Sequence, residues 1–310
     1  MQVFNDWRSI PQGARGASVA LGNFDGVHLG HRAVIDLARA QGPEGAPLGV
    51  VTFSPHPRAF FAPAAPAFRL MSSKARAREM SRIGVARLYD LEFNAALAAF
   101  TPTEFARDVL ADALGITHVT VGADFNFGKD RAGRAQDLAA MGAKFGFGVT
   151  IAKMVAHDGA EVSSTAIRAA LTAGSPRAAA QMLGHPHRFE GAVIHGHKRG
   201  RELGYPTANM DISGLHLPRF GVYAVRVSVL TGVHQGDYIG AASLGVRPMF
   251  GENQPNLETF IFDFSGDLYG AEISVDLIEF LRDEAKFDGL PALLAQMEQD
   301  CARSRAILSA

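Results

Sequence analysis

Cysteine is almost absent from this 310-residue chain, and long apolar runs are missing altogether. The one cysteine, Cys301, excludes an intramolecular disulfide and any metal site built from cysteine. No stretch of about 18 apolar residues occurs, so the sequence predicts no membrane-spanning helix. The first residues, MQVFNDWRSIPQ, lack the basic start and apolar run of a secretion signal. We therefore expect a soluble, cytoplasmic protein.

An excess of charge of either sign is also lacking. Thirty Lys and Arg residues stand against 31 Asp and Glu residues, which gives a formal net charge of -1. This balance argues against nucleic acid or a membrane surface as a partner, apart from a local basic patch. Hydrophobic residues make up 47% and charged residues 20%, as in ordinary globular proteins. At roughly 100–200 residues per domain, the length suggests two domains.

The first half of the chain alternates apolar runs with helical segments. Runs such as ASVALGNF, LGVVTF and ITHVTVGADF have the Val, Ile, Leu and Phe content of strands buried on both faces. Helices are expected between such strands, at HRAVIDLARAQG, TPTEFARDVLADALG and SSTAIRAALTAG. This alternation predicts an α/β domain with a doubly wound, mostly parallel sheet over residues 1–184. The Ala- and Pro-rich piece at 59–68 has neither period and is expected to form a surface loop.

The second half, residues 185–310, has a different sequence pattern. Apolar segments such as FEGAVIHG, GVYAVRVSVL and LETFIFDF are separated by Gly, Pro and Asn clusters. Tyr223, Val225 and Val227 alternate with Ala224 and Arg226, the period of two expected of half-buried antiparallel strands. Five or six strands without intervening helices should close into a small barrel, because closure leaves the fewest exposed edges. One helix is expected at the C-terminus, over LPALLAQMEQDCARSRAIL.

The stretch GNFDGVHLGH, residues 22–31, joins the first buried strand to the first helix. Its three glycines allow a tight turn and a close approach of the backbone to a ligand. The start of the helix offers free N–H groups and a partial positive charge to an anion. His28 and His31 share a face if the first helical turn includes both, and two imidazoles there suit phosphate oxygens. The pattern favours a phosphate-binding loop.

Other interpretations of the same stretch stay open at this point. The two histidines could also act as metal ligands or as helix caps, although no nearby carboxylate or cysteine completes a convincing set of metal ligands. The stretch has neither the Gly-Lys-Ser/Thr ending of the P-loop nor the glycine spacing of the dinucleotide-binding fingerprint. The sequence therefore argues against those two nucleotide-binding modes.

A second group of hydrogen-bond donors opens the helix expected at SSTAIR, residues 163–168. One of Ser163 and Ser164 is expected to cap that helix. Ser164, Thr165 and Arg168 together form a donor cluster, in which Arg168 can bind phosphate through two parallel hydrogen bonds. Two such helix starts facing one crevice would clamp a polyphosphate chain.

These motifs resemble a known family. GNFDGVHLGH together with SSTAIR is similar to the nucleotidylyltransferase superfamily, and TFSPHP (52–57) and VGADFNFG (121–128) narrow the resemblance to bacterial bifunctional riboflavin kinase/FMN adenylyltransferases, the FAD synthetases. The similarity runs from about Val19 to Asp300, with the motifs in family order. It implies a nucleotidylyltransferase domain over 1–184 and a riboflavin kinase barrel with a C-terminal helix over 185–310. Riboflavin would be phosphorylated to FMN, and FMN adenylylated to FAD with release of pyrophosphate.

In the first domain, the resemblance and the loop chemistry together assign the adenylyl transfer. Its expected catalytic residues are His28, His31 and Arg168. ATP and its phosphates are expected to contact Gly22, Asn23, Phe24, Gly30, Ser164 and Thr165. The flavin is expected to contact Phe53, Pro55, Asp124, Phe125 and Phe127. No general base is expected here, because the second pKa of a phosphate monoester is about 6 and the attacking FMN phosphate is already ionised.

In the second domain, GRELGYPTAN (200–209) resembles the riboflavin kinase signature. Spacing alone would favour a barrel corner shaped by its glycines and Pro206. The resemblance implies instead that Thr207 and Asn209 hold Mg²⁺ and that Thr207 also contacts ATP phosphate, in keeping with the preference of Mg²⁺ for oxygen ligands. Gly196 and Gly204 bound a loop expected to contact ATP. The cations in this loop would cover the nucleotide or form a solvated face: Lys198, Arg199 and Arg201.

Glu258 lies on an apolar strand, where a buried carboxylate is costly unless it is paired. By family similarity it is the base that accepts the proton of riboflavin's terminal ribityl hydroxyl. The alternation in LETFIFDF leaves open a second interpretation, in which Glu258 faces outward into solvent. The segment LRDEAKF (281–287) is also family-like, and its Arg282 is assigned to flavin contact.

Three positions depart from the family pattern. Ser54 stands where Glu often precedes Pro-His-Pro, Asn126 where Arg is frequent, and Met249 where Thr is usual. These departures affect expected flavin or adenine contacts, and none removes a proposed phosphate, metal or base residue.

The expected partners are therefore small molecules: riboflavin, FMN and ATP, with Mg²⁺ as the cofactor. Neither nucleic acid nor a membrane is expected as a partner, and self-association is left open. Two rival functions remain at this point. One is an enzyme with a single activity, in which either half has become a docking or regulatory module. The other is a flavin-binding or sensory protein without turnover.

Overall fold

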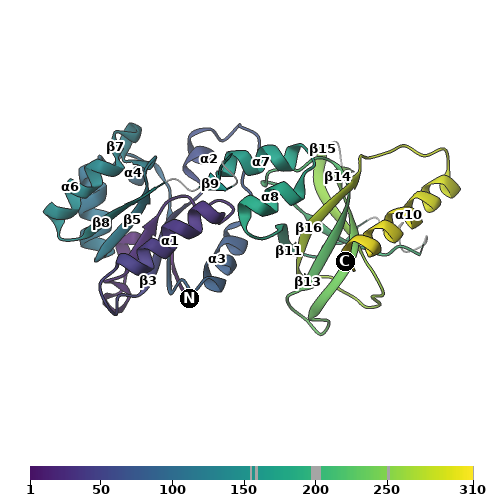
Figure 1. Cartoon of the computed structure of the whole chain (residues 1–310), viewed down its shortest axis with the longest axis horizontal. Helices are drawn as coiled ribbons and strands as arrows, with labels where there is room; N and C mark the ends of the chain where they lie inside the picture. Colours follow the sequence, from purple (N-terminus) through teal and green to yellow (C-terminus); the bar gives the residue numbers. More distant parts are fainter. Residues whose placement is uncertain (154–155, 158–159, 197–203, 250–251, 310) are drawn as a thin grey trace. The chain divides into compact units, whose positions relative to one another are not determined.

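The computed structural model describes residues 1–310 except 154–155, 158–159, 197–203, 250–251 and 310. The chain forms two compact units. The first consists of Met1–Pro66 and Ser73–Val162, and the second of Ala67–Ser72 and Ser163–Ala310. Figure 1 shows helices and a sheet in the first unit, and antiparallel strands with a long C-terminal helix in the second. The predicted fold class, α/β followed by a β-barrel with a C-terminal helix, is confirmed.

The division between the two units falls before helix α7 (Ser164–Thr172). This helix and α8 (Pro176–Leu183) bury Ile167, Leu171 and Leu183 in one small apolar cluster with Leu70. Helix α8 also packs against strands of the second unit. Contacts therefore place both helices with the barrel, whereas the domain boundary predicted between 184 and 185 follows them. That boundary stays a prediction.

The first unit is built on a six-stranded sheet whose strands are all parallel. In spatial order they are β1 (Gln2–Phe4), β4 (Arg87–Glu92), β3 (Leu48–Ser54), β2 (Ser18–Leu21), β5 (His118–Gly122) and β8 (Gly148–Ala152). From β2 the chain winds outward through β3 and β4, then crosses to the other side of β2 to form β5 and β8. In open sheets of this class, ligands bind outside the carboxyl ends of the strands where the winding reverses. Here that point lies between β2 and β5.

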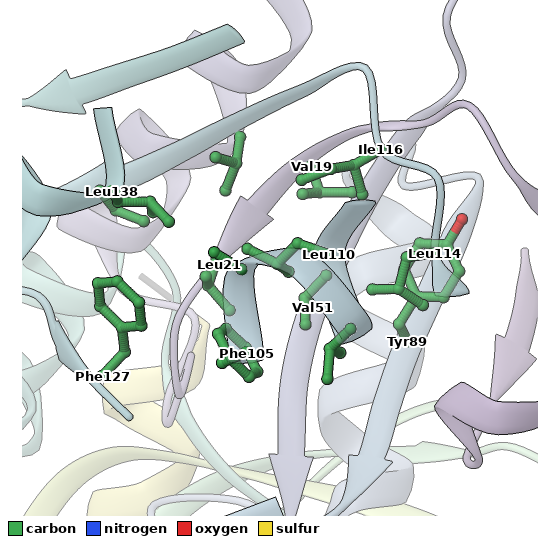
Figure 2. Packing of buried hydrophobic residues seen from close by; sticks show 14 of the residues in the cluster. Val19, Leu21, Val51, Tyr89, Phe105, Leu110, Leu114, Ile116, Phe127 and Leu138 are labelled. Carbon is green, nitrogen blue, oxygen red and sulfur yellow. The ribbon is translucent and has the colours of Figure 1, made fainter. Parts of the chain in front are cut away.

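Helices cover both faces of this sheet. The π-helix η3 (Phe105–Ala113) and α6 (Ala135–Phe145) bury apolar side chains against one face, shown close up in Figure 2. On the other face, the Ser18 hydroxyl donates a hydrogen bond to the carbonyl of Ala38 in α1 (Leu29–Gln41), over 2.5 Å. Helix α3 (Ser73–Arg82) lies on this second face too, since it contacts Asp90 while the neighbouring Tyr89 joins the cluster with η3.

Shorter elements complete the first unit. They are η1 (Trp7–Ser9), η2 (Gln12–Ala14), α2 (Pro57–Phe61), α4 (Ala95–Ala98), α5 (Pro102–Glu104), β6 (Asn126–Phe127), η4 (Lys129–Arg131), β7 (Gly133–Arg134), β9 (Ala156–His157) and β10 (Ala160–Glu161).

Local sequence signals explain several of these elements. Thr101 caps α5 through a capping box, in which its Oγ1 accepts from the Glu104 N–H and the Glu104 carboxylate accepts from the Thr101 N–H. The helix expected over TPTEFARDVLADALG is present, and beyond that start it is a π-helix over Phe105–Ala113; nothing in the local sequence explains this helix type. The loop expected at 59–68 is wrong for its first three residues, which complete α2 behind the His56 cap.

The second unit contains a six-stranded antiparallel sheet. In spatial order its strands are β11 (His187–Ala192), β16 (Glu272–Arg282), β13 (Gly221–Val229), β14 (Gly236–Met249), β15 (Glu252–Ile261) and β12 (Thr207–Asp211). Just beyond β11, the Ile194 N–H donates to the Asn209 carbonyl over 2.8 Å, which joins the first edge of the sheet to the last. The predicted closure into a small barrel follows from this bridge.

The period-two pattern of β13 sorts its side chains as predicted. Tyr223, Val225 and Val227 lie in the core of the barrel. Ala224 faces the other way and packs against Leu308 of α10 (Leu290–Leu308), the helix that covers β13, β14 and β16. Among the helices that the structure describes, none combines the length and the apolarity needed to cross a membrane.

Candidate active sites

The loop that follows β2 starts at the point where the winding of the parallel sheet reverses. Three of its residues, Phe24, Gly26 and Val27, have positive φ angles of 51°, 89° and 44°. Glycine adopts such angles freely, whereas phenylalanine and β-branched valine rarely do. Backbone of this kind persists only where its surroundings hold it, and it clusters at functional sites. Both Phe24 and Val27 are fully buried and hold the loop to the unit.

His28 is the N-cap of α1 rather than part of its first turn. Its Nδ1 accepts a hydrogen bond from the His31 N–H over 3.2 Å, so the cap interpretation holds for this residue. The two imidazole rings nevertheless stack, with centroids 3.5 Å apart and planes 17° apart. Gly30 makes room for them, because a Cβ at this position would lie 3.1 Å from His28 Cε1. The predicted pairing of the two histidines is therefore present.

The ring of His31 lies in a setting that alters its protonation. Its Nδ1 is buried and has no hydrogen-bond partner within the part of the chain that the structure describes. Burial of the ring lowers the pKa of His31 well below its usual value, and the nearby charges of His28 and Arg76 lower it further. The free protein therefore holds this imidazole neutral near pH 7, with a single N–H to donate.

The donors of the second predicted cluster lie at the start of α7. Ser163 is the cap, since its Oγ accepts from the Ala166 N–H over 3.2 Å. Ser164 and Thr165 occupy the first turn and are partly buried and exposed, respectively. Arg168 donates from Nε to the Phe68 carbonyl over 2.6 Å, with its guanidinium 5.3 Å from the centre of the Phe68 ring.

The two helix starts belong to different compact units, because α1 lies in the first and α7 in the second. The clamp formed by both starts on one polyphosphate chain therefore stays a prediction.

The expected flavin contacts lie at or just after the carboxyl ends of two strands that flank β2. Phe53 is near the carboxyl end of β3, followed by Pro55, while Asp124 and Phe125 come just after β5. Phe53 is almost fully buried and packs against Phe105, with ring centroids 6.3 Å apart. Parallel strands place these carboxyl ends at the same edge of the sheet as the loop after β2.

Phe125 and Phe127 stack with ring centroids 5.7 Å apart and planes 12° apart. Phe127 is buried, whereas Phe125 is partly exposed. Of the two, Phe125 is thus the one with ring surface left to offer a ligand.

The three principal kinase residues converge in the barrel. Asn209 on β12 lies opposite Glu258 on β15 in the strand register, and Thr207 is on the same strand as Asn209. The Asn256 amide donates to both the Asn209 Oδ1 and the Glu258 Oε1, over 3.1 Å each. The Asn209 amide donates in turn to the Thr207 carbonyl over 3.2 Å. Glu258 is partly buried and bound within this network, as a carboxylate on an apolar strand requires.

Gly196 packs directly on this group. A Cβ at position 196 would overlap the side-chain amide of Asn209, so only glycine fits without displacing it. Gly204 has a φ of 83°, a conformation that favours glycine. The three cations expected between these glycines lie outside the described residues: Lys198, Arg199 and Arg201.

Arg282, the expected flavin contact, is already engaged within the barrel unit. Its Nε and Nη2 donate to the buried carboxylate of Asp300 in α10, the latter over 2.7 Å. Its Nη1 donates to the carbonyl of Asp283. The guanidinium thus fastens α10 to β16, and only its remaining N–H groups are available to a flavin.

The three residues that depart from the family pattern differ in their surroundings. Ser54 joins a buried network with Arg76 and Asp90. The Asn126 amide donates to the Asp124 carbonyl over 2.7 Å. The side chain of Met249 lies outside what the structure describes.

Sequence reasoning missed Arg76, Asp90 and Asn256. Asn256 had a usable signal, because it is two residues before Glu258 on a strand and therefore points to the same face. Arg76 and Asp90 had none, since their pairing depends on how α3 docks on the sheet.

Comparison with known proteins matches the two halves of the chain to different family models. A family model described as FAD synthetase matches residues 10–166, and one described as riboflavin kinase matches residues 183–308. A bifunctional riboflavin kinase/FMN adenylyltransferase from Pseudomonas fluorescens is 39% identical over 99% of this chain and 98% of its own. A protein of the same name from Listeria monocytogenes is 38% identical over 94% and 92%. The crystal structure of a macrolide-efflux protein from Streptococcus pneumoniae is 32% identical, with a TM-score of 0.82 over 96% of each chain. The chain belongs to the family of bifunctional riboflavin kinase/FMN adenylyltransferases.

Proposed function

We propose that this chain makes FAD from riboflavin in two steps. ATP first phosphorylates riboflavin to FMN, and a second ATP then adenylylates FMN to FAD and pyrophosphate. The full-length kinship with bifunctional relatives supports both activities. The observation that carries the proposal is that each half of the chain has its own reactive group. The first has a stacked histidine pair at the switch point of a parallel sheet, and the second has a carboxylate bonded within a set of oxygen ligands.

In the kinase step, Glu258 accepts the proton of the terminal ribityl hydroxyl. The hydroxyl oxygen forms a bond to the γ-phosphorus, and the bond from that phosphorus to the β–γ bridging oxygen breaks as ADP leaves. Phosphoryl transfer depends on alignment and on neutralising charge more than on covalent chemistry. The hydrogen bond from Asn256 holds the Glu258 carboxylate in one orientation for this task.

The oxygen set of the barrel fits Mg²⁺. We assign Thr207 and Asn209 as its protein ligands, because hydroxyl and amide oxygens are hard donors that Mg²⁺ accepts. The described residues contain no group of three or more His, Cys, Asp and Glu side chains able to hold a metal. Phosphate oxygens of ATP and water would complete the coordination, as is usual for this ion. When bound, Mg²⁺ neutralises charge that develops on the transferred phosphate.

In the adenylyl transfer step, an FMN phosphate oxygen bonds to the α-phosphorus of ATP. The bond from that phosphorus to the α–β bridging oxygen breaks, and pyrophosphate leaves. The residues that bind and stabilise these anions are the loop after β2 with His28 and His31, and Ser164, Thr165 and Arg168 of α7. Removing one oriented donor of this kind costs on the order of 10²–10³ in rate.

For the flavin of this second step, we propose contacts with Phe53, Pro55, Asp124, Phe125 and Phe127. Arg282 contacts the flavin of the kinase step through the N–H groups that Asp300 and Asp283 leave free. We place the protein in the cytoplasm, where ATP for both steps is made.

Chromatography of flavins tests the proposed function. The protein is incubated with riboflavin, ATP and MgCl₂, and in parallel with FMN, ATP and MgCl₂. We expect FMN and FAD in the first mixture and FAD in the second, and no product in either once EDTA removes the metal. Unchanged riboflavin and FMN would identify a flavin-binding protein without turnover, and FMN without FAD would show that the first site is inactive.

A further inference from the structure

A buried ion pair lies beside the loop after β2 without a role in the steps above. Arg76 of α3 donates from Nη2 to Asp90 of β4 over 2.7 Å, and the two side chains are only 3% and 10% exposed. Ser54, at the end of β3, accepts from the same nitrogen over 3.1 Å and donates to Asp90 over 2.8 Å. Burying two charges costs free energy that the pair alone often fails to recover. The cost of this burial therefore points to a role beyond stability.

The second arm of the Arg76 guanidinium reaches the loop. Its Nη1 donates to the Asn23 carbonyl over 3.2 Å, and that carbonyl also accepts from the Thr52 hydroxyl over 3.1 Å. Because the peptide unit is planar, fixing the Asn23 carbonyl also fixes the direction of the Phe24 N–H. Phe24 is the first of the residues with positive φ in this loop. Arg76 thus holds the loop where its strained backbone begins.

Helix α3 is itself held in place. Glu79, one turn after Arg76, pairs with Arg32 of α1 over 2.7 Å. Helix α1 begins with the stacked pair of His28 and His31. The charge of Arg76 is also among the causes that lower the pKa of His31, in keeping with a guanidinium close to this pair.

We propose that Arg76 is a positioning residue for adenylyl transfer. With Asp90 and Ser54 as its anchor, it fixes the Asn23–Phe24 peptide and so the shape of the loop that binds the phosphates. This inference rests on the proposed function of that loop. Arginine suits the task because its planar fork bridges two acceptors, whereas the single ammonium of lysine does not reproduce this geometry.

The first test compares Arg76→Lys with the wild type and with Arg107→Lys, a matched change in an exposed pair with Asp108. We expect kcat for FMN adenylylation to fall about 10²-fold in R76K, since small misplacements at a reaction centre have effects of this size. Riboflavin phosphorylation should stay at the wild-type rate, and R107K should match the wild type in both reactions. Wild-type adenylylation by R76K, or an equal loss of both activities, would overturn the proposal.

A charge relocation separates positioning from simple loss of a partner. Asp90→Ser leaves the guanidinium unpaired, and adding Ser54→Glu returns a carboxylate within reach of it. We expect D90S to lose adenylylation and the double variant S54E/D90S to regain at least part of it. No recovery in a folded double variant would count against the proposed anchor.

A measurement without substrate keeps the inference independent of turnover. Amide hydrogen exchange of residues 22–31 should be faster in R76K than in wild type, and unchanged in R107K. Unchanged amide exchange of residues 22–31 in R76K would refute the positioning role even if the wild type makes FAD. Faster exchange in R76K, together with a wild-type protein that makes no FAD, would instead leave the positioning role intact and refute the proposed reaction.

Discussion

Asn256 links the proposed base of the kinase to a proposed metal ligand through one side-chain amide. It is buried, and its two N–H groups are directed to Glu258 and Asn209. With both bonds made, the Glu258 carboxylate and the Asn209 oxygen have fixed orientations. Partners that orient a reactive group in this way typically contribute 10–100-fold to activity.

Asn256→Leu removes both hydrogen bonds at nearly constant size. We expect kcat for riboflavin phosphorylation to fall by about 10–100-fold, with adenylylation of supplied FMN unchanged. Steady-state kinetics of each half-reaction provides the measurement. Wild-type phosphorylation by N256L would show that the network has no part in the chemistry.

Single residues also mark what the sequence was able to predict about the sites. Family motifs on two strands assigned Asn209 and Glu258 to the same kinase site, and the structure adds that the strand register places the two residues opposite each other. The pairing of Arg76 with Asp90 joins a helix to a strand through the docking of α3. No period or motif encodes that docking, so the structure alone reveals it.

Among the elements, α10 was predicted from the sequence with its correct bounds, whereas α3 was not predicted at all. The predicted C-terminal run coincides with α10, because apolar residues recur along it between Gly289 and the chain end. Helix α3, SKARAREMSR, has few apolar residues and escaped notice. It docks with Ala75 and Met80, supported by the ion pairs of Arg76 and Glu79. Hydrophobic periodicity does not detect a helix held in this way.

The attachment of α10 to the barrel gives a prediction at this scale. Asp300 accepts from Arg282 and from Gln296, and both members of the ion pair are largely shielded from solvent. Asp300→Asn keeps the size and removes the charge, so we expect a loss of about 1–3 kcal/mol in the free energy of unfolding by urea.

Asp283→Asn is the matched control, because the Asp283 pair with Arg219 is exposed on both sides. Exposed pairs contribute about 0–1 kcal/mol. Equal stability of D300N and D283N would show that this ion pair does not hold α10.

At the scale of the whole molecule, the change in residue composition near residue 184 predicted the two kinds of fold. It did not predict where the contacts divide the chain into two units. Composition marks where helices give way to strands, whereas contacts with the barrel decide the unit to which α7 and α8 belong. Helix α8 packs against β11 and β16, and the Leu171 carbonyl of α7 accepts a hydrogen bond from the Arg219 N–H. Packing partners of this kind are not written into local sequence. The predicted clamp between α1 and α7 depends on the placement of both units, and a crystal structure with a bound ATP analogue tests it.

The stability of the protein should depend on pH through His187. Burial first, and then the charges of His216, His185 and Arg188, lower the pKa of this imidazole to about 3. The unfolded chain binds the proton near its ordinary pKa of about 6.5. The folded state therefore has its full stability above pH 6.5 and loses it as the pH falls toward 3. Between pH 7 and 5 the loss from this group is about 2 kcal/mol.

His187→Gln removes this titration. We expect the free energy of unfolding of H187Q to decrease less between pH 7 and 5 than that of wild type, as measured by urea denaturation at both values. His195→Gln, at an exposed histidine, should keep the wild-type slope. Identical pH dependence of H187Q and wild type would contradict the buried, neutral state of His187.

The central claim is that one chain carries two separate chemistries, and measuring both half-reactions in two variants tests it most directly. FMN formation from riboflavin and FAD formation from supplied FMN are assayed in His28→Ala and Glu258→Ala. The account predicts that H28A loses FAD formation by about 10²-fold or more and keeps FMN formation, and that E258A shows the reverse. Equal loss of both activities in each variant would contradict it.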